Sequence, residues 1–154
     1  MGETGYMFSR LSFCKDMLEG IEELLRTGRW ADALLVAEGV ANQQPLNAKA
    51  HGYIGLCHFR LGQFEQAVEP LRKALTLDEH YWEAGTKLAQ ALDRLQRYEE
   101  ALEVVEKCLK DRPSDPTLVH LQSGLKRNVP ERITDSWQKS VVLDWHRVEL
   151  THRD

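Results

Sequence analysis

The sequence predicts an all-α protein in which three helical hairpins stack one upon another. The main observation is a turn pattern that recurs every 34 residues, as Gly-Arg-Trp-Ala-Asp-Ala at 28–33, Gly-Gln-Phe-Glu-Gln-Ala at 62–67 and Gln-Arg-Tyr-Glu-Glu-Ala at 96–101. The same interval relates Gly55 to Ala89. Self-similarity at this period is typical of stacked repeats, because one hairpin cannot bury its apolar face alone.

Each repeat is expected to contain two helices. The first runs about a dozen residues to the turn, and the second runs from the aromatic residue to a proline or an acidic break. Two helices joined by a tight turn form an antiparallel hairpin. Small residues such as Ala67 and Ala101 let neighbouring helices approach closely, while Trp30, Phe64 and Tyr98 are expected to fill the wedge between them.

The C-terminal part departs from the repeat. Asp115-Pro116 is expected to open a helix that ends near Arg127, because proline suits the first helical turn. Its apolar side would shield the last hairpin. The run Asn128-Val129-Pro130 then breaks the chain.

A further amphipathic helix is predicted after this break. Its apolar residues recur at steps of three and four, which is the spacing of one helix face. They are Ile133, Trp137, Val141 and Trp145. Four interpretations stay open: a second cap on the stack, docking on a partner, dimerisation, and occupation of the chain's own groove.

The repeated residues carry a resemblance to the tetratricopeptide repeat family. The middle copy matches best, through Gly55, Gly62, Phe64, Ala67 and Ala74. The resemblance implies a right-handed superhelix of three such hairpins with a capping helix and an extra C-terminal helix. The expected segments are a partly disordered stretch at 1–13, repeats at 14–47, 48–81 and 82–115, the capping helix at 116–128, and the C-terminal helix and tail at 129–154.

The resemblance also implies a binding groove. In the family, the first helix of each repeat lines the concave surface, where ligands bind. The residues at the matching places are Leu18, Leu25, Lys49, Tyr53, Leu56, Phe59, Arg60, Lys87 and Arg94. Apolar and aromatic side chains occupy the first two repeats, a composition that suits a peptide or an amphipathic helix of a partner protein. Alternatively, Tyr53 and Phe59 are buried between helices and simply hold the stack.

One well-known ligand of this family is disfavoured. Family members clamp the acidic C-terminal carboxylate of heat-shock chaperones with Lys and Asn from their first helices. The matching places here carry Leu18, Glu22, Tyr53, Glu83 and Lys87, so only the last is basic.

Composition restricts the remaining classes of function. A net charge of −4 argues against nucleic acid as a partner, since that binding depends on clustered Lys and Arg. The sequence has no apolar run long enough to span a bilayer and no secretory signal, so a cytoplasmic location without membrane insertion is expected. Three widely separated cysteines fit reduced thiols better than disulfides.

Catalytic and metal-binding signatures are missing. The sequence contains no phosphate-binding glycine loop, no Gly-x-Ser-x-Gly elbow, and no paired CxxC or HExxH motif. His51 and His58 stand near Cys57, but packing explains them better than a zinc site. We therefore expect no cofactor, no metal and no enzymatic activity.

These observations predict a non-catalytic protein interaction module, acting as an adaptor, a scaffold or a subunit of a complex. The alternative is a dedicated chaperone that shields an apolar segment of a client, as some three-repeat bacterial secretion chaperones do. An enzyme is the third and least favoured class. The C-terminal helix could also join two copies of the chain into a homo-oligomer.

Overall fold

The computed structural model describes residues 3–129 of the chain. Within that range it contains α-helices and no strand, so the all-α prediction is confirmed for the described residues. The helices are α1 (Glu3–Arg26), α2 (Trp30–Gln43), α3 (Ala48–Arg60), α4 (Phe64–Leu77), α5 (Trp82–Arg94), α6 (Tyr98–Asp111) and α7 (Pro116–Asn128). The predicted amphipathic helix at 129–154 lies outside the described residues.

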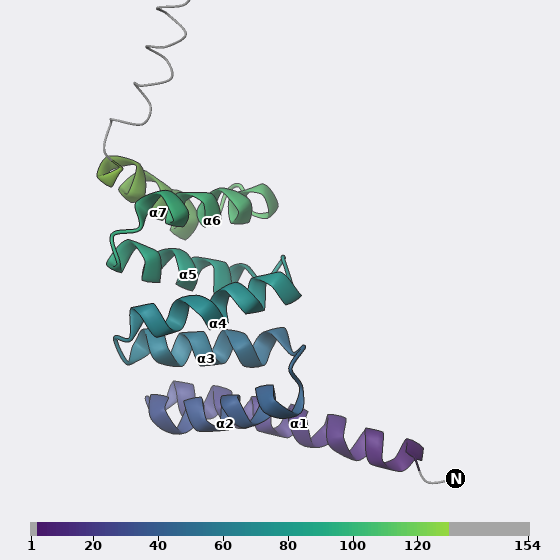
Figure 1. The fold of residues 1–154 in the computed structure, drawn as a ribbon. Coiled ribbons are helices and arrows are strands. Elements are labelled where there is room, and N and C mark those ends of the chain that lie inside the picture. Colours follow the sequence, from purple (N-terminus) through teal and green to yellow (C-terminus); the bar gives the residue numbers. More distant parts are fainter. Residues whose placement is uncertain (1–2, 130–154) are drawn as a thin grey trace, which may run out of the picture.

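The helices stack as successive hairpins. Figure 1 shows them piled from α1 and α2 at one end to α7 at the other, with their axes running across the stack. This arrangement is the helical repeat fold that the 34-residue period predicts. Helix α1 is the exception in length, because it begins at Glu3, well before the expected start of the first repeat near Cys14. Its N-terminal turns project past the edge of the stack (Figure 1).

A left-handed residue closes the first helix of every hairpin. Gly28 and Gly62 both have φ of 77°, and Gln96 has φ of 60° at the equivalent place. At the second turn, the amide of Gly62 donates to the carbonyl of Phe59 at 3.1 Å, and the next amide donates to that of His58 at 2.9 Å. These bonds satisfy carbonyls at the end of α3 and turn the chain sharply into α4.

Side-chain caps start two of the helices. The Asn47 side chain accepts a hydrogen bond from the amide of Ala50 at 3.1 Å at the beginning of α3. The Asp115 carboxylate accepts from the amides of Thr117 and Leu118 at the beginning of α7, where Pro116 occupies the first turn. Such caps satisfy amide groups that have no partner inside the helix.

The buried residues form two clusters that correspond to the two ends of the stack. One lies among α1, α2 and α3 and contains Ile21, Ala37 and Val40. The other runs from α4 to α7, where Leu118 and Leu125 of α7 are buried against the last hairpin. Helix α7 therefore covers the apolar face that the third hairpin would otherwise expose.

The stack has an inner and an outer side. Helices α1 and α3, α3 and α5, and α5 and α7 approach until their Cα atoms lie within 8 Å, whereas among the described residues no such approach joins α2 to α4 or α4 to α6. The odd-numbered helices are thus closer together than the even-numbered ones. In a curved stack the closer set lies on the concave side, so α1, α3 and α5 line the inner surface.

Among the helices of residues 3–129, none is both long and apolar enough to cross a membrane.

Candidate functional site

The residues that the sequence assigns to a groove all lie on the inner helices α1, α3 and α5. Six of them are half-buried, namely Leu18, Leu25, Tyr53, Leu56, Phe59 and Lys87. Three others are exposed, namely Lys49, Arg60 and Arg94. Tyr53 packs against the first buried cluster and Phe59 against the second, yet neither is fully enclosed. Both side chains therefore contribute to the packing between helices and also expose part of their surface to solvent.

Four residues form what we call the acidic row: Glu22, Tyr53, Tyr81 and Glu83. The Tyr53 hydroxyl donates a hydrogen bond of 2.6 Å to the Glu22 carboxylate, which ties α3 to α1. Tyr81 lies against Gly52, where a Cβ would stand only 2.5 Å from the Tyr81 ring. Sequence reasoning missed Tyr81, because its role depends on the absence of a side chain at Gly52.

Electrostatics support this grouping. Burial and the carboxylates of Glu83 and Glu22 raise the pKa of Tyr81 to about 12. Burial and the same two carboxylates also raise the pKa of Tyr53 above its usual value. Glu22 and Glu83 therefore act on the same two hydroxyl groups, although they come from α1 and α5.

Two cations form what we call the basic pair: Arg60 and Lys87. The Arg60 guanidinium lies 5.2 Å from the centroid of the Trp30 ring, and the Lys87 ammonium lies 5.3 Å from that of Phe59. The Phe59 ring in turn packs edge-on against Phe64, with 5.4 Å between centroids. These contacts join all three hairpins, because cations are attracted to the faces of aromatic rings.

The basic pair lacks an acidic partner. Lys87 donates to the Gln90 amide oxygen at 3.0 Å, and burial followed by the positive charge of Arg60 lowers its pKa. In the part of the chain that the structure describes, neither Arg60 nor Lys87 makes an ion pair with a carboxylate. Other arginines of the same range do, namely Arg26, Arg29, Arg72, Arg97 and Arg112.

The outer side carries a separate cleft of 590 Å³ between α4 and α6. Its floor includes Leu75, Leu88 and Cys108, and basic residues such as Lys107 and Lys110 stand at its rim. Sequence reasoning did not predict this cleft, because it results from the wide spacing of the even-numbered helices rather than from a motif.

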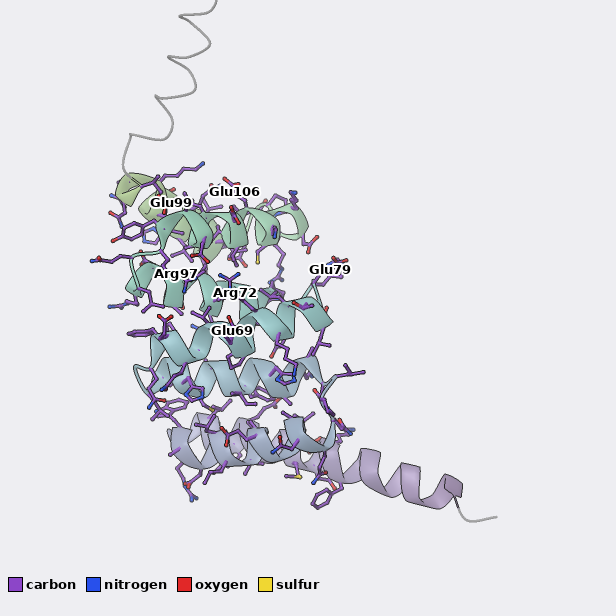
Figure 2. All side chains as sticks on the ribbon, viewed as in Figure 1. Glu69, Arg72, Glu79, Arg97, Glu99 and Glu106 are labelled. Atoms are coloured by element: carbon purple, nitrogen blue, oxygen red, sulfur yellow. The ribbon has the colours of Figure 1, made fainter. Side chains whose placement is uncertain are left out.

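Ion pairs bridge the outer side. The Arg72 side chain of α4 donates to the Glu100 carboxylate of α6, and the Arg97 guanidinium donates to the same carboxylate at 2.7 Å. Figure 2 shows Arg72, Glu69 and Arg97 on the face of the stack toward the viewer, over α4 and α6. This network ties the second hairpin to the third, opposite to the groove.

The histidines and cysteines have structural contacts. A ring nitrogen of His51 lies 2.9 Å from the Pro45 carbonyl, and one of His58 lies 2.8 Å from the Gln63 amide oxygen. Cys57 is buried, and burial raises the pKa of its thiol to about 11. No cluster of three or more His, Cys, Asp or Glu in the described range could hold a metal ion. The second predicted interface, formed by Ile133, Trp137, Val141 and Trp145, lies outside the described residues.

The fold and its comparisons define the class of protein. A family model described as anaphase-promoting complex, cyclosome, subunit 3 matches residues 26–108, which is more than half of the chain. This model is of the tetratricopeptide type. The chain therefore belongs to this tetratricopeptide-type family, as its repeated residues suggest.

One curated human protein is similar to most of this chain. Human zinc finger CCCH domain-containing protein 7B is 29% identical over 121 residues, which is 75% of this chain and 12% of that protein. The chain thus spans about an eighth of the length of this curated relative.

Solved structures share the fold. The Arabidopsis OM64 TPR domain has a TM-score of 0.74 at 20% identity and covers 78% of this chain and 99% of that domain. The second TPR domain of human RPAP3, in complex with the HSP70 peptide SGPTIEEVD, has a TM-score of 0.68 at 20% identity, with 77% and 97% covered.

Proposed function

We propose that the chain is a non-catalytic protein interaction module that binds a peptide or helix of a partner protein in the groove of α1, α3 and α5. The observation that carries this proposal is the surface around Tyr53 and Phe59. It combines half-exposed aromatic rings with charged groups that have no counter-charge in the described part of the chain. Such a surface gains most when a partner covers it, because aromatic anchors in a rigid concavity dominate binding energy.

The comparisons support a role in assembly. The matching family takes its name from a subunit of a complex, and the second TPR domain of human RPAP3 binds a peptide. By analogy, the chain would act as an adaptor, a scaffold or a subunit, with no catalytic role of its own. We further propose a cytoplasmic location, no nucleic-acid partner, and a second interface on the segment with Trp137 and Trp145, through which two copies could associate.

The test is affinity capture from native cytosol followed by mass spectrometry. The variant Tyr53→Ala/Phe59→Ala removes both aromatic anchors. It should lose partners that the wild type holds, since truncation of such anchors costs about 2 kcal/mol or more of binding free energy. Circular dichroism at the capture temperature must first establish that the variant is folded, because Phe59 also packs against the buried cluster.

A matched control changes exposed apolar side chains that lie outside α1, α3 and α5. Leu35→Ala/Val119→Ala removes two apolar side chains that are exposed, at 69% and 42%, on α2 and α7. This control should retain the partners. Equal capture by the wild type and the Tyr53→Ala/Phe59→Ala variant would place recognition elsewhere and reject the groove.

A further inference from the structure

The groove carries two charged sets of opposite sign, and each lacks an internal counter-charge. Within the described residues, Arg60 and Lys87 have no carboxylate partner, while Glu83 has no cationic partner. Glu22 accepts a hydrogen bond from the neutral Tyr53 hydroxyl. On the outer side, the Arg72, Arg97 and Glu100 network pairs charges of opposite sign between two hairpins.

The basic pair is arranged as a receptor for an anion. Its two cations come from α3 and α5 and lie close enough for the charge of Arg60 to disfavour protonation of Lys87. Both rest on aromatic rings, which hold them in place and remove part of their water. An anion between them would relieve their repulsion and replace lost hydration.

The two charged sets stand one to two helical turns apart. Along α5, Glu83 precedes Lys87 by about one turn, and along α3, Tyr53 precedes Arg60 by about two. At about 1.5 Å per residue these separations are roughly 6 and 10 Å. Two or three residues of an extended chain cover the same distance, at about 3.3 Å per residue.

We propose that the groove recognises an internal segment of a partner protein with one acidic and one basic side chain, the carboxylate held by Arg60 and Lys87 and the cation held by Glu22 and Glu83. The two side chains stand two or three positions apart in the partner. This inference rests on the proposed function, which it makes more specific. It also distinguishes the ligand from an all-acidic C-terminal peptide, because the acidic row repels a terminal carboxylate.

The first experiment selects random dodecapeptides, displayed between two fused domains, on the purified full-length chain. Relative to the starting library, selected peptides should be enriched in an Asp or Glu paired with a Lys or Arg two or three positions away. Selected peptides without that enrichment would overturn the inference and leave the proposed function standing. A failure to select any peptide would count against both.

The second experiment measures one selected peptide by fluorescence anisotropy. Arg60→Glu/Lys87→Glu should weaken its affinity by about tenfold or more, because like charges then face each other. Replacing the peptide's acidic residue by Lys should restore affinity for this variant only. The control Lys73→Glu/Lys126→Glu makes the same change in net charge at exposed positions outside the groove and should bind as the wild type does.

A charge-neutral variant and an acidic probe peptide complete the test. If the charge-reversed variant does not fold, Arg60→Gln/Lys87→Gln removes the charges without introducing repulsion and should still weaken binding. The peptide SGPTIEEVD, which the second TPR domain of human RPAP3 binds, serves as an acidic probe. Its affinity should fall below that of the selected peptide, and tighter binding of SGPTIEEVD would overturn the inference.

Discussion

At the scale of single residues, the three turns differ in one position. Gly28 and Gly62 adopt a left-handed backbone at no steric cost, whereas Gln96 adopts the same conformation with a side chain. A left-handed residue other than glycine costs roughly 1 kcal/mol. The third turn is therefore strained relative to the first two.

The variant Gln96→Gly should raise the free energy of unfolding by about 0.5–1 kcal/mol. The gain is smaller than the strain itself, because glycine also increases the entropy of the unfolded chain. Chemical denaturation monitored by circular dichroism measures it. The reciprocal variant Gly62→Gln should lower stability, and a decrease for Gln96→Gly would show that the backbone conformation carries no strain.

The left-handed turn at Gln96 also shows which features of the fold the repeat pattern predicts. The repeat interval places a turn there although the glycine is missing, because neighbouring positions such as Tyr98 and Ala101 keep the pattern. The resemblance to the tetratricopeptide repeat family, rather than the interval, implies which helices line the groove. The contact between Tyr81 and Gly52 and the early start of α1 at Glu3 have no counterpart in the repeat, so they could not be predicted from it.

At the scale of helices, packing inside a hairpin depends on matched pairs of side chains. Gly55 of α3 faces Leu71 of α4, and a Cβ at Gly55 would lie 2.4 Å from the Leu71 Cγ. The positions 34 residues later hold Ala89 and Val105, both fully buried. Compared with the second hairpin, the third thus has a larger residue on its first helix and a smaller one on its second helix.

Gly55→Ala should accordingly destabilise the protein, by about 1–3 kcal/mol, because overpacked cores are forced into strained arrangements. Adding Leu71→Val reproduces the pair of the third hairpin. The double variant should be more stable than the sum of the two single effects by about 1 kcal/mol, since residues in contact couple. Thermal and denaturant unfolding of the wild type, the two single variants and the double variant give a double-mutant cycle. Strictly additive changes in the free energy of unfolding would contradict the matched-pair account.

The loop between α4 and α5 is linked to α6 by a titratable contact. The His80 ring nitrogen lies 3.0 Å from the Asp111 carboxylate, and this hydrogen bond and charge raise the pKa of His80 above 6.5. Because the folded pKa is raised, the contact stabilises the fold fully below the unfolded pKa. The stabilisation is lost as pH rises through the folded pKa.

An NMR titration of His80 should therefore give a pKa above 6.5. In Asp111→Asn the value should move back toward 6.5, and the loss of stability between neutral and alkaline pH should diminish. An unchanged His80 titration in Asp111→Asn would show that the contact does not form in solution.

At the scale of the whole molecule, the curvature of the stack separates two surfaces. The inner helices bring Tyr53, Phe59 and the charged sets together from three hairpins, whereas the outer helices leave a cleft spanned by ion pairs. The resemblance to the tetratricopeptide repeat family implied the inner surface, since in that family the first helix of each hairpin lines the groove. The outer cleft depends on distances between helices, which a sequence pattern does not specify.

The most direct test of the central claim is a lysine footprint of the complex between the chain and its captured partner. Lysines are acetylated with and without the partner and then quantified by mass spectrometry. Binding in the groove predicts protection of Lys49 and Lys87, with Lys73, Lys107 and Lys110 on the outer helices reacting as they do in the isolated chain. Protection of the outer lysines with unchanged reactivity of Lys49 and Lys87 would contradict the account and move the binding site to the outer side.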